Sequence, residues 1–145
     1  MRIEKKTFDE LSTRELYALL KLRVDVFVVE QNCPYPELGD TDEVAMHFLG
    51  YEGEQLAAYL RTYERTPGEY GIGRIVTQMN HRGKGLAAEL IRLAMGYIKS
   101  LPGAKRIVVQ AQSHLVDYYS GFGFSVCSEE YLEDDIPHTD LDLNL

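Results

Sequence analysis

The sequence predicts an α/β fold, in which one mixed and mostly antiparallel sheet is flanked by helices. Several short apolar runs are separated by turn signals, which indicates strands. Two longer segments carry apolar residues at the spacing of amphipathic helices. A glycine-rich turn near the middle of the chain joins an extended run to the second of these helices. Antiparallel strands followed by a strand–helix–strand crossover give a sheet of this mixed kind.

The first part of the chain contains a short strand and a helix with a marked start. Residues 1–8 form the predicted strand. Ser12 and Glu15 stand in the S-x-x-E order of a capping box, in which the two side chains satisfy backbone N–H groups at the helix start. The helix should break before Pro34, because proline cannot continue it. An acidic loop, residues 34–43, follows.

The rest of the chain alternates strands with two helices. Glycine and proline next to polar residues mark the turns between them. The predicted strands are 45–52, 56–65, 70–77, 105–111, 122–129 and 137–144, and the predicted helices are 85–99 and 113–120.

Length and composition restrict the class of protein. A chain of 145 residues, 45% hydrophobic and 26% charged, suits one globular domain over residues 1–145. Its formal charge of −8 disfavours nucleic acid and anionic membranes as partners. No apolar run has membrane-spanning length and the first residues lack an apolar signal core, so we expect a cytoplasmic protein. We also expect a monomer or homodimer. Cys33 and Cys127 match no zinc spacing, and no other ligand set indicates a metal.

The most informative segment is the loop Arg82–Ala87, with the sequence R-G-K-G-L-A, between a predicted strand and a predicted helix. Free backbone N–H groups and the positive end of the helix dipole meet at such a turn, and together they favour an anion such as pyrophosphate. Arg82, Gly85 and Ala87 fit the acyl-CoA loop R-x-x-G-x-G/A. An ordinary strand-to-helix turn is the alternative that the loop alone leaves open.

Two other nucleotide sites are disfavoured by spacing. A P-loop requires serine or threonine after Gly83-Lys84, where this chain has Gly85. A dinucleotide fingerprint is matched by Gly83, Gly85 and Ala88, but the next strand has no acidic residue to bind a ribose. A nucleotide-binding oxidoreductase is therefore disfavoured.

A second motif, Y-x-x-x-G-F, is formed by Tyr119, Gly123 and Phe124 after the following predicted strand. With both motifs in this order, nearly the whole chain resembles the GNAT superfamily of acetyl-CoA-dependent N-acetyltransferases. The runs 27–35 and 135–138 are more narrowly similar to the ElaA-type branch of that superfamily.

The resemblance implies a GNAT-like fold in which the central strands 70–77 and 105–111 splay apart and hold the pantetheine arm of acetyl-CoA between them. Backbone groups of the first strand would bind the pantetheine, and the glycine-rich loop would bind the pyrophosphate. Gln112 stands where the superfamily commonly has asparagine. The implied cofactor-binding residues are Ile75, Val76, Thr77, Arg82, Gly83, Lys84, Gly85, Leu86, Ala87 and Gln112.

The implied activity is direct transfer of an acetyl group, within a ternary complex, to a primary amine on a small molecule or a peptide. Tyr119 is the implied proton donor to the departing thiolate. The corner Glu30-Gln31-Asn32, after the first helix, is expected to contact the acceptor. The general base stays open among Glu30, Glu43, His47, His114 and His138.

The main alternative function is a noncatalytic acyl-CoA-binding or sensing module on the same fold, and Tyr119 argues against it. The net charge of −8 and the acidic stretch Glu37–Glu43 further predict that a cationic acceptor is attracted, more weakly as salt is added.

Overall fold

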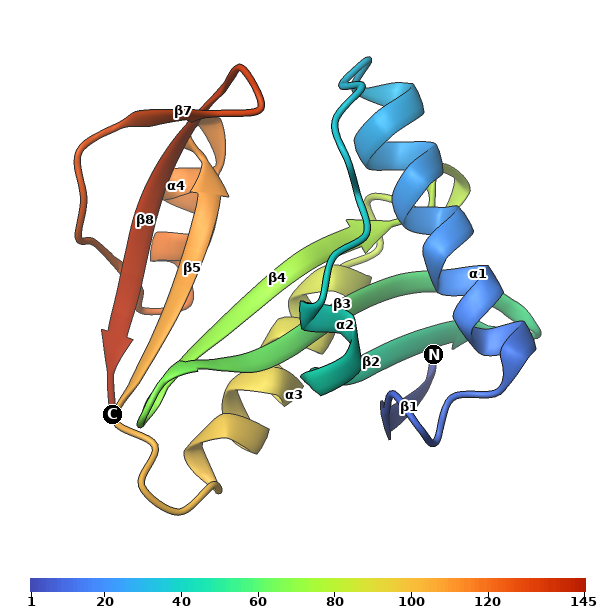
Figure 1. Ribbon diagram of the computed structural model, residues 1–145, viewed down its shortest axis with the longest axis horizontal. Helices are drawn as coiled ribbons and strands as arrows, with labels where there is room; N and C mark the ends of the chain where they lie inside the picture. The colour runs from blue at the N-terminus through green and yellow to red at the C-terminus, as the bar shows by residue number, and fades with distance from the viewer.

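One sheet runs through the molecule in the strand order β1-β2-β3-β4-β5-β8-β6, with β7 also pairing with β8. All strand pairs are antiparallel except β4 with β5. This computed structural model describes residues 1–145, and it confirms the predicted mixed α/β fold (Figure 1). The strands are β1 (Arg2–Thr7), β2 (Met46–Glu52), β3 (Gln55–Thr66), β4 (Glu69–Thr77), β5 (Arg106–Gln112), β6 (Ser125–Val126), β7 (Tyr131–Glu133) and β8 (Ile136–Asn144). The helices are α1 (Thr13–Arg23), η1 (Val24–Glu30), α2 (Thr41–Val44), η2 (Met79–His81), α3 (Leu86–Lys99), η3 (Ser113–Leu115) and α4 (Val116–Ser120).

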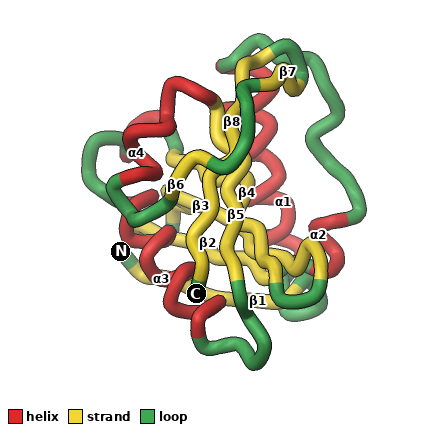
Figure 2. Tube along the Cα trace, turned by 90° about the vertical axis from the view of Figure 1, so that its left-hand side faces the viewer, coloured by secondary structure: helices red, strands yellow, loops and turns green.

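Helices cover both faces of the sheet, each over its own apolar core. Figure 2 shows α3 and α4 on one side of the strands and α1 on the other. The predicted apolar stripe of α3 is buried against the sheet, at Leu86, Leu90, Ile91, Ala94 and Ile98. A second, smaller core lies under α1 and includes Leu19 and Leu22. The sheet is thus supported on both sides.

The first helix starts as predicted and then changes its winding. The Ser12 Oγ accepts a hydrogen bond from the Glu15 N–H over 3.0 Å, and Glu15 Oε1 accepts one from the Ser12 N–H over 2.8 Å. After α1 the chain continues as the π-helix η1, a wider form that is rare and often found at functional sites. Asn32, with φ of 50°, ends the helical run, so the predicted break before Pro34 is confirmed.

The predicted strand 122–129 is wrong for most of its length. Gly123 has φ of 99° and belongs to the turn after α4, so only the two-residue β6 remains. The structure also contains β7, which the sequence analysis missed. It pairs with β8 through a two-residue turn at Asp134 and Asp135, whose φ values are 50° and 62°. Aspartate tolerates this left-handed conformation, which the tightest hairpin turns require.

The two central strands separate, as the resemblance implied. β4 and β5 pair only from Glu69 to Gly71, opposite Arg106 to Val108. Beyond these residues each strand keeps a partner only on its outer side, and Figure 1 shows β4 and β5 diverging. The separation opens the centre of the sheet.

Candidate active site

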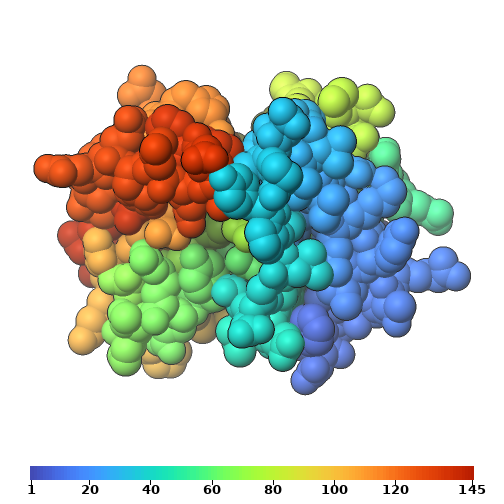
Figure 3. Space-filling view, turned by 45° about the horizontal axis from the view of Figure 1, so that its top comes forward, coloured from blue at the N-terminus to red at the C-terminus, as the bar shows by residue number.

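A cleft of about 790 Å³ occupies the gap between β4 and β5. Its lining comes from η1 and the following loop, from β4 and β5, from α4, and from the β7–β8 hairpin. In Figure 3 the red C-terminal strands meet the cyan segment that follows η1, beside the groove that separates the two halves. Both halves of the chain therefore build one site.

The β4 wall of the cleft contains a β-bulge. Val76 pairs with Tyr59 and Gly73 pairs with Arg61, so two residues of β4, Arg74 and Ile75, lie opposite one residue of β3. Arg74 has φ of 51°, which is uncommon for a residue with a side chain. A bulge leaves backbone groups without ladder partners. It occurs where Ile75, Val76 and Thr77 were predicted to bind pantetheine, and all three line the cleft.

An arginine–carboxylate network behind this wall holds the bulge in place. Glu37 Oε2 accepts hydrogen bonds from Arg74 Nε over 2.6 Å and from Arg23 Nε over 2.8 Å. Asp42 Oδ1 accepts one from Arg23 and one from Arg61, each over 2.7 Å. Arg23 is completely buried. Sequence analysis missed this network, since nothing in the local pattern links residues so far apart.

The network binds two of the four acidic residues in the stretch Glu37–Glu43, which we expected to attract the acceptor. Burial alone would raise the pKa of Asp42, but its bonds to Arg23 and Arg61 outweigh burial and lower that pKa. The carboxylates of Glu37 and Asp42 are therefore neutralised by arginines inside the protein. These two residues hold the cleft wall in place, and the prediction of charge attraction now depends on the other acidic residues.

The glycine-rich loop starts α3 in the manner expected of an anion site. Gly85 is the N-cap of α3 with φ of 76°, and Gly83 has φ of 80°. A Cβ added at either glycine would meet no atom within 4 Å, so the loop is open to a ligand. Lys84 is exposed and forms no ion pair. Arg82 and Ala87 line the cleft, whereas Gly83, Lys84, Gly85 and Leu86 lie beyond it.

Arg82, predicted to contact the cofactor, forms a two-point ion pair with Glu30, predicted to contact the acceptor. Its two terminal nitrogens donate to the Glu30 carboxylate over 2.8 and 2.9 Å, and its Nε donates to the Thr77 carbonyl oxygen over 3.2 Å. The hydrogen bond from Arg82 lowers the pKa of Glu30. A lowered pKa makes Glu30 a poor general base.

Tyr119 lies on the opposite wall with its hydroxyl unpaired. The residue is only 7% exposed and lines the cleft, and no protein group hydrogen-bonds its hydroxyl. Burial raises its pKa well above the usual value, so the phenol stays protonated. The neighbouring Tyr118 packs edge-on against it and is 42% exposed. Next to this wall, the Gln112 amide donates to the Gln31 side chain over 3.3 Å.

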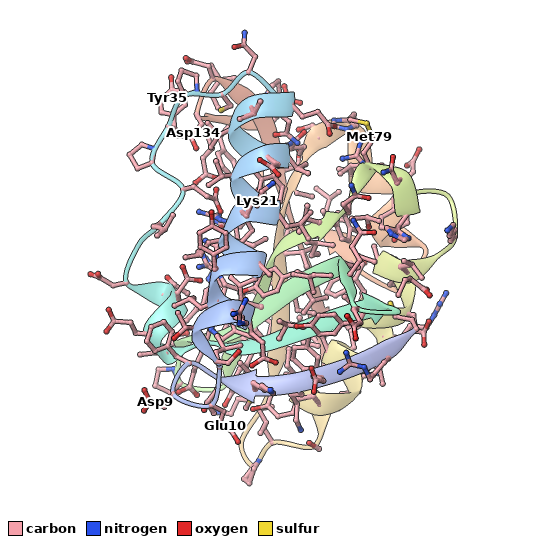
Figure 4. The ribbon with its side chains drawn as sticks, turned by 90° about the vertical axis from the view of Figure 1, so that its right-hand side faces the viewer. Asp9, Glu10, Lys21, Tyr35, Met79 and Asp134 are labelled. Atoms are coloured by element: carbon pink, nitrogen blue, oxygen red, sulfur yellow. The ribbon has the colours of Figure 1, made fainter.

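A strap, defined as residues 33–37, crosses the cleft and joins the β7–β8 turn. Tyr35 donates its hydroxyl hydrogen to Asp135 over 2.5 Å, and the Cys33 thiol donates to the Asp134 carbonyl oxygen over 3.5 Å. Figure 4 shows Tyr35 and Asp134 close together at the end of the molecule. The strap therefore roofs the half of the cleft that lies away from the glycine-rich loop.

Residues 21–145 match the model of the acetyltransferase (GNAT) domain. The chain belongs to the GNAT acetyltransferase family. It is 38% identical to Protein ElaA of Escherichia coli over 89% of this chain and 87% of that protein. The crystal structure of E. coli ElaA has a TM-score of 0.91 at 35% identity, covering 98% of this chain and 99% of ElaA.

Two further solved structures show the same fold. An acyl-CoA N-acyltransferase from Pseudomonas aeruginosa is 39% identical, with a TM-score of 0.91 and coverage of 98% of this chain and 99% of that one. A Bacillus subtilis acetyltransferase in complex with CoA has a TM-score of 0.69 at 22% identity, with 99% and 98% coverage. The predicted GNAT membership and the similarity to ElaA are confirmed.

Some of the remaining candidate residues of this GNAT protein line the cleft and others lie outside it. Asn32 does not line the cleft and instead ends the helix, whereas Glu30 and Gln31 do line it. His47 is buried outside the cleft between Tyr59 and the Asp42 carbonyl oxygen, and burial lowers its pKa. Glu43 also lies outside the cleft.

Two histidines remain at the cleft. His114 and His138 both line it. His138 Nδ1 lies 2.8 Å from the Ile136 carbonyl oxygen, which can only accept, so Nδ1 carries the hydrogen. The Nε2 atom of neutral His138 is then a free proton acceptor. No three His, Cys, Asp or Glu side chains are grouped to hold a metal ion, and no helix has the length and apolar character needed to span a bilayer.

Proposed function

We propose that this GNAT protein transfers the acetyl group of acetyl-CoA directly to a primary amine. The observation that carries the proposal is the cleft between β4 and β5, which joins an anion-binding loop at one end to the unpaired hydroxyl of Tyr119. The backbone N–H groups of residues 83–87 would hold the pyrophosphate. The backbone of Ile75 in the bulge, and of Val76 next to it, would pair with the pantetheine amides.

The reaction needs two proton transfers, and the cleft offers a group for each. The amine nitrogen attacks the thioester carbonyl carbon, the C–N bond forms, and the C–S bond breaks to release the CoA thiolate. Tyr119 donates its proton to that thiolate. At pH 7 a primary amine with a pKa of about 10.4 is mostly protonated, at a cost of about 4–5 kcal/mol. His138 Nε2 would take the amine proton, directly or through water.

Direct transfer fits the cleft better than an acyl-enzyme. Cys33 is the one thiol in the cleft lining, and burial raises its pKa while its hydrogen is donated to Asp134. A thiol held in this way is a weak nucleophile, because the thiolate is the reactive form. The amine would therefore attack acetyl-CoA itself.

Acetyl-CoA turnover against a panel of primary amines tests the proposal. We expect thiol release that depends on both acetyl-CoA and an amine, with the acceptor gaining the mass of one acetyl group. A noncatalytic acyl-CoA-binding module would instead bind acetyl-CoA and release no thiol with any amine in the panel. That result would replace the proposed function with the alternative.

A further inference from the structure

The proposed function leaves the class of amine open, and the roofed half of the cleft restricts it. This half lies beneath the strap and the β7–β8 turn, with η1 on one side. The π-helix contributes apolar side chains from Val26, Phe27 and Val28. An acceptor under the strap would pack against these apolar side chains.

The free negative charge of the cleft gathers at one end. Four acidic residues line the cleft, and two of them are neutralised: Glu30 by Arg82, and Glu37 by Arg23 and Arg74. The other two are Glu133 and Asp134, next to the strap. Neither has an arginine or lysine partner, and the nearest cationic candidate is His138, whose Nε2 is 3.9 Å from the Glu133 carboxylate.

A second observation shows that the same cleft is built for a ligand. The Tyr119 hydroxyl belongs to a side chain that is more than nine-tenths buried, lines the cleft and has no hydrogen-bond partner in the protein. Because the rest of this side chain is packed inside the protein, a group that bonds the hydroxyl has to reach it through the cleft. The acidic end and this hydroxyl therefore belong to one binding site.

We propose that the acceptor is a linear amine with a second positive charge, which Glu133 and Asp134 bind while the reacting amine reaches His138 and Tyr119. The proposal rests on the proposed function. The Glu133 carboxylate lies 3.9 Å from His138 Nε2, so the acidic pair and the candidate base occupy the same end of the cleft. A flexible methylene chain would join the reacting amine to the second charge at this end of the cleft. Diamines and the lysine-like ends of peptides share this chemistry.

A matched series of amines separates charge from length. The probes are a five-carbon diamine, pentylamine, and the five-carbon amine that ends in a carboxylate, so only the far end changes. Each is titrated by calorimetry at low salt into the protein saturated with CoA. We expect the diamine to bind about tenfold more tightly than pentylamine, which corresponds to about 1.4 kcal/mol. The carboxylate compound should bind most weakly.

A double variant tests the two carboxylates. In the double variant Glu133→Gln with Asp134→Asn, the diamine and pentylamine should bind with nearly equal affinity. Asparagine tolerates the left-handed turn conformation, so the hairpin is kept. The control is Glu129→Gln with Glu130→Gln, two exposed residues outside the cleft that make the same change in net charge. It should keep the preference.

Binding and turnover are read separately, so the two proposals fail separately. Equal binding of the diamine and pentylamine, no diamine binding, or a preference that survives the double variant would overturn this inference. Preferential diamine binding without any thiol release would support the inference and overturn the proposed acetyl transfer. If pentylamine and the diamine bound with equal affinity and both were acetylated, the proposed acetyl transfer would stand and this inference would be overturned.

Discussion

Tyr119 is the residue whose removal should affect chemistry and little else. Tyr119→Phe keeps the ring that packs in the core and removes only the unpaired hydroxyl. Loss of a positioned acid typically lowers the rate about 10²–10⁴-fold. The fall should appear in kcat rather than in acetyl-CoA affinity, because the thiolate forms only late in the reaction. Steady-state kinetics and calorimetry with CoA measure the two quantities.

Tyr118→Phe is the matched control for this prediction, because the neighbouring ring is half exposed and would lose the same atom. Its kcat should stay within about threefold of the wild type. A Tyr119→Phe protein that turns over at the wild-type rate, with the chemical step limiting, would make Tyr119 a packing residue.

Residues of the site differ in how far the sequence could predict them. Tyr119 and Gly85 belong to short motifs whose spacing reflects one local turn each, so they were found. Arg74 and Glu37 are 37 positions apart and meet only when β4 packs beside the strap. No local periodicity encodes such a meeting, and the pairing was not predicted. Sequence patterns locate contacts within an element better than contacts between elements.

At the scale of elements, the loop before α3 should bind the phosphates of CoA through its backbone. Gly85→Glu would place a carboxylate against the phosphates and force glutamate into a left-handed conformation, at about 1–2 kcal/mol. We expect the affinity for CoA to fall at least about tenfold, measured by calorimetry on the folded variant.

Gly103 offers a control with the same backbone strain. Its φ is 77°, close to the 76° of Gly85, and an added Cβ would also meet no atom within 4 Å. Gly103→Glu in the distant loop after α3 should lose similar stability and keep CoA affinity. Equal CoA affinity in the two variants would show that the loop does not bind CoA.

The bulge of β4 gives a second prediction at this scale, about stability. In most strand positions glycine is less stable than alanine. At position 74 the order should reverse, because φ of 51° strains any residue with a Cβ. We expect Arg74→Gly to be more stable than Arg74→Ala by about 1 kcal/mol in urea unfolding. The ordinary order, with alanine more stable, would show that this backbone conformation is not fixed in the folded protein.

Helices and strands were predicted well where a strong local sequence signal determines their bounds. They were predicted poorly where packing against other elements determines them. The capping box located the start of α1, and the apolar stripe located α3. A strand was predicted over 122–129, but the positive φ of Gly123 turns the chain there. The π-helical winding of η1 also carries no sequence signature that differs from an α-helix.

At the scale of the whole molecule, Asp42 is the point where distant parts are fastened together. Its carboxylate accepts hydrogen bonds from Arg23 at the end of α1 and from Arg61 in β3. Arg23 also donates a hydrogen bond to Glu37 in the strap. Removing one partner of a buried pair typically costs about 3–5 kcal/mol, because the other charge stays buried without compensation. Asp42→Asn should therefore lower the free energy of unfolding by about that amount at pH 7.

The pKa of the Asp42 carboxylate determines how the stability lost in Asp42→Asn depends on pH. The pKa of Asp42 is lower in the folded protein than in the unfolded chain, so in acid the unfolded state binds the proton first. The stabilisation is complete above the unfolded pKa of about 3.9 and decreases as the pH falls through the folded value. The difference between wild type and Asp42→Asn should thus be constant near neutrality and shrink below about pH 4. Urea unfolding across this range measures it.

An exposed carboxylate provides the comparison for Asp42. Asp25 pairs with Lys21 over 2.7 Å one helical turn away, but its side chain is 54% exposed. Such pairs contribute only about 0.3–0.5 kcal/mol, so Asp25→Asn should cost little at any pH. If Asp42→Asn cost no more than Asp25→Asn, the network would not fasten α1, the strap and β4 together. The bulge of β4 beside the cleft would then be stabilised by the β3–β4 ladder and not by the arginine–carboxylate network.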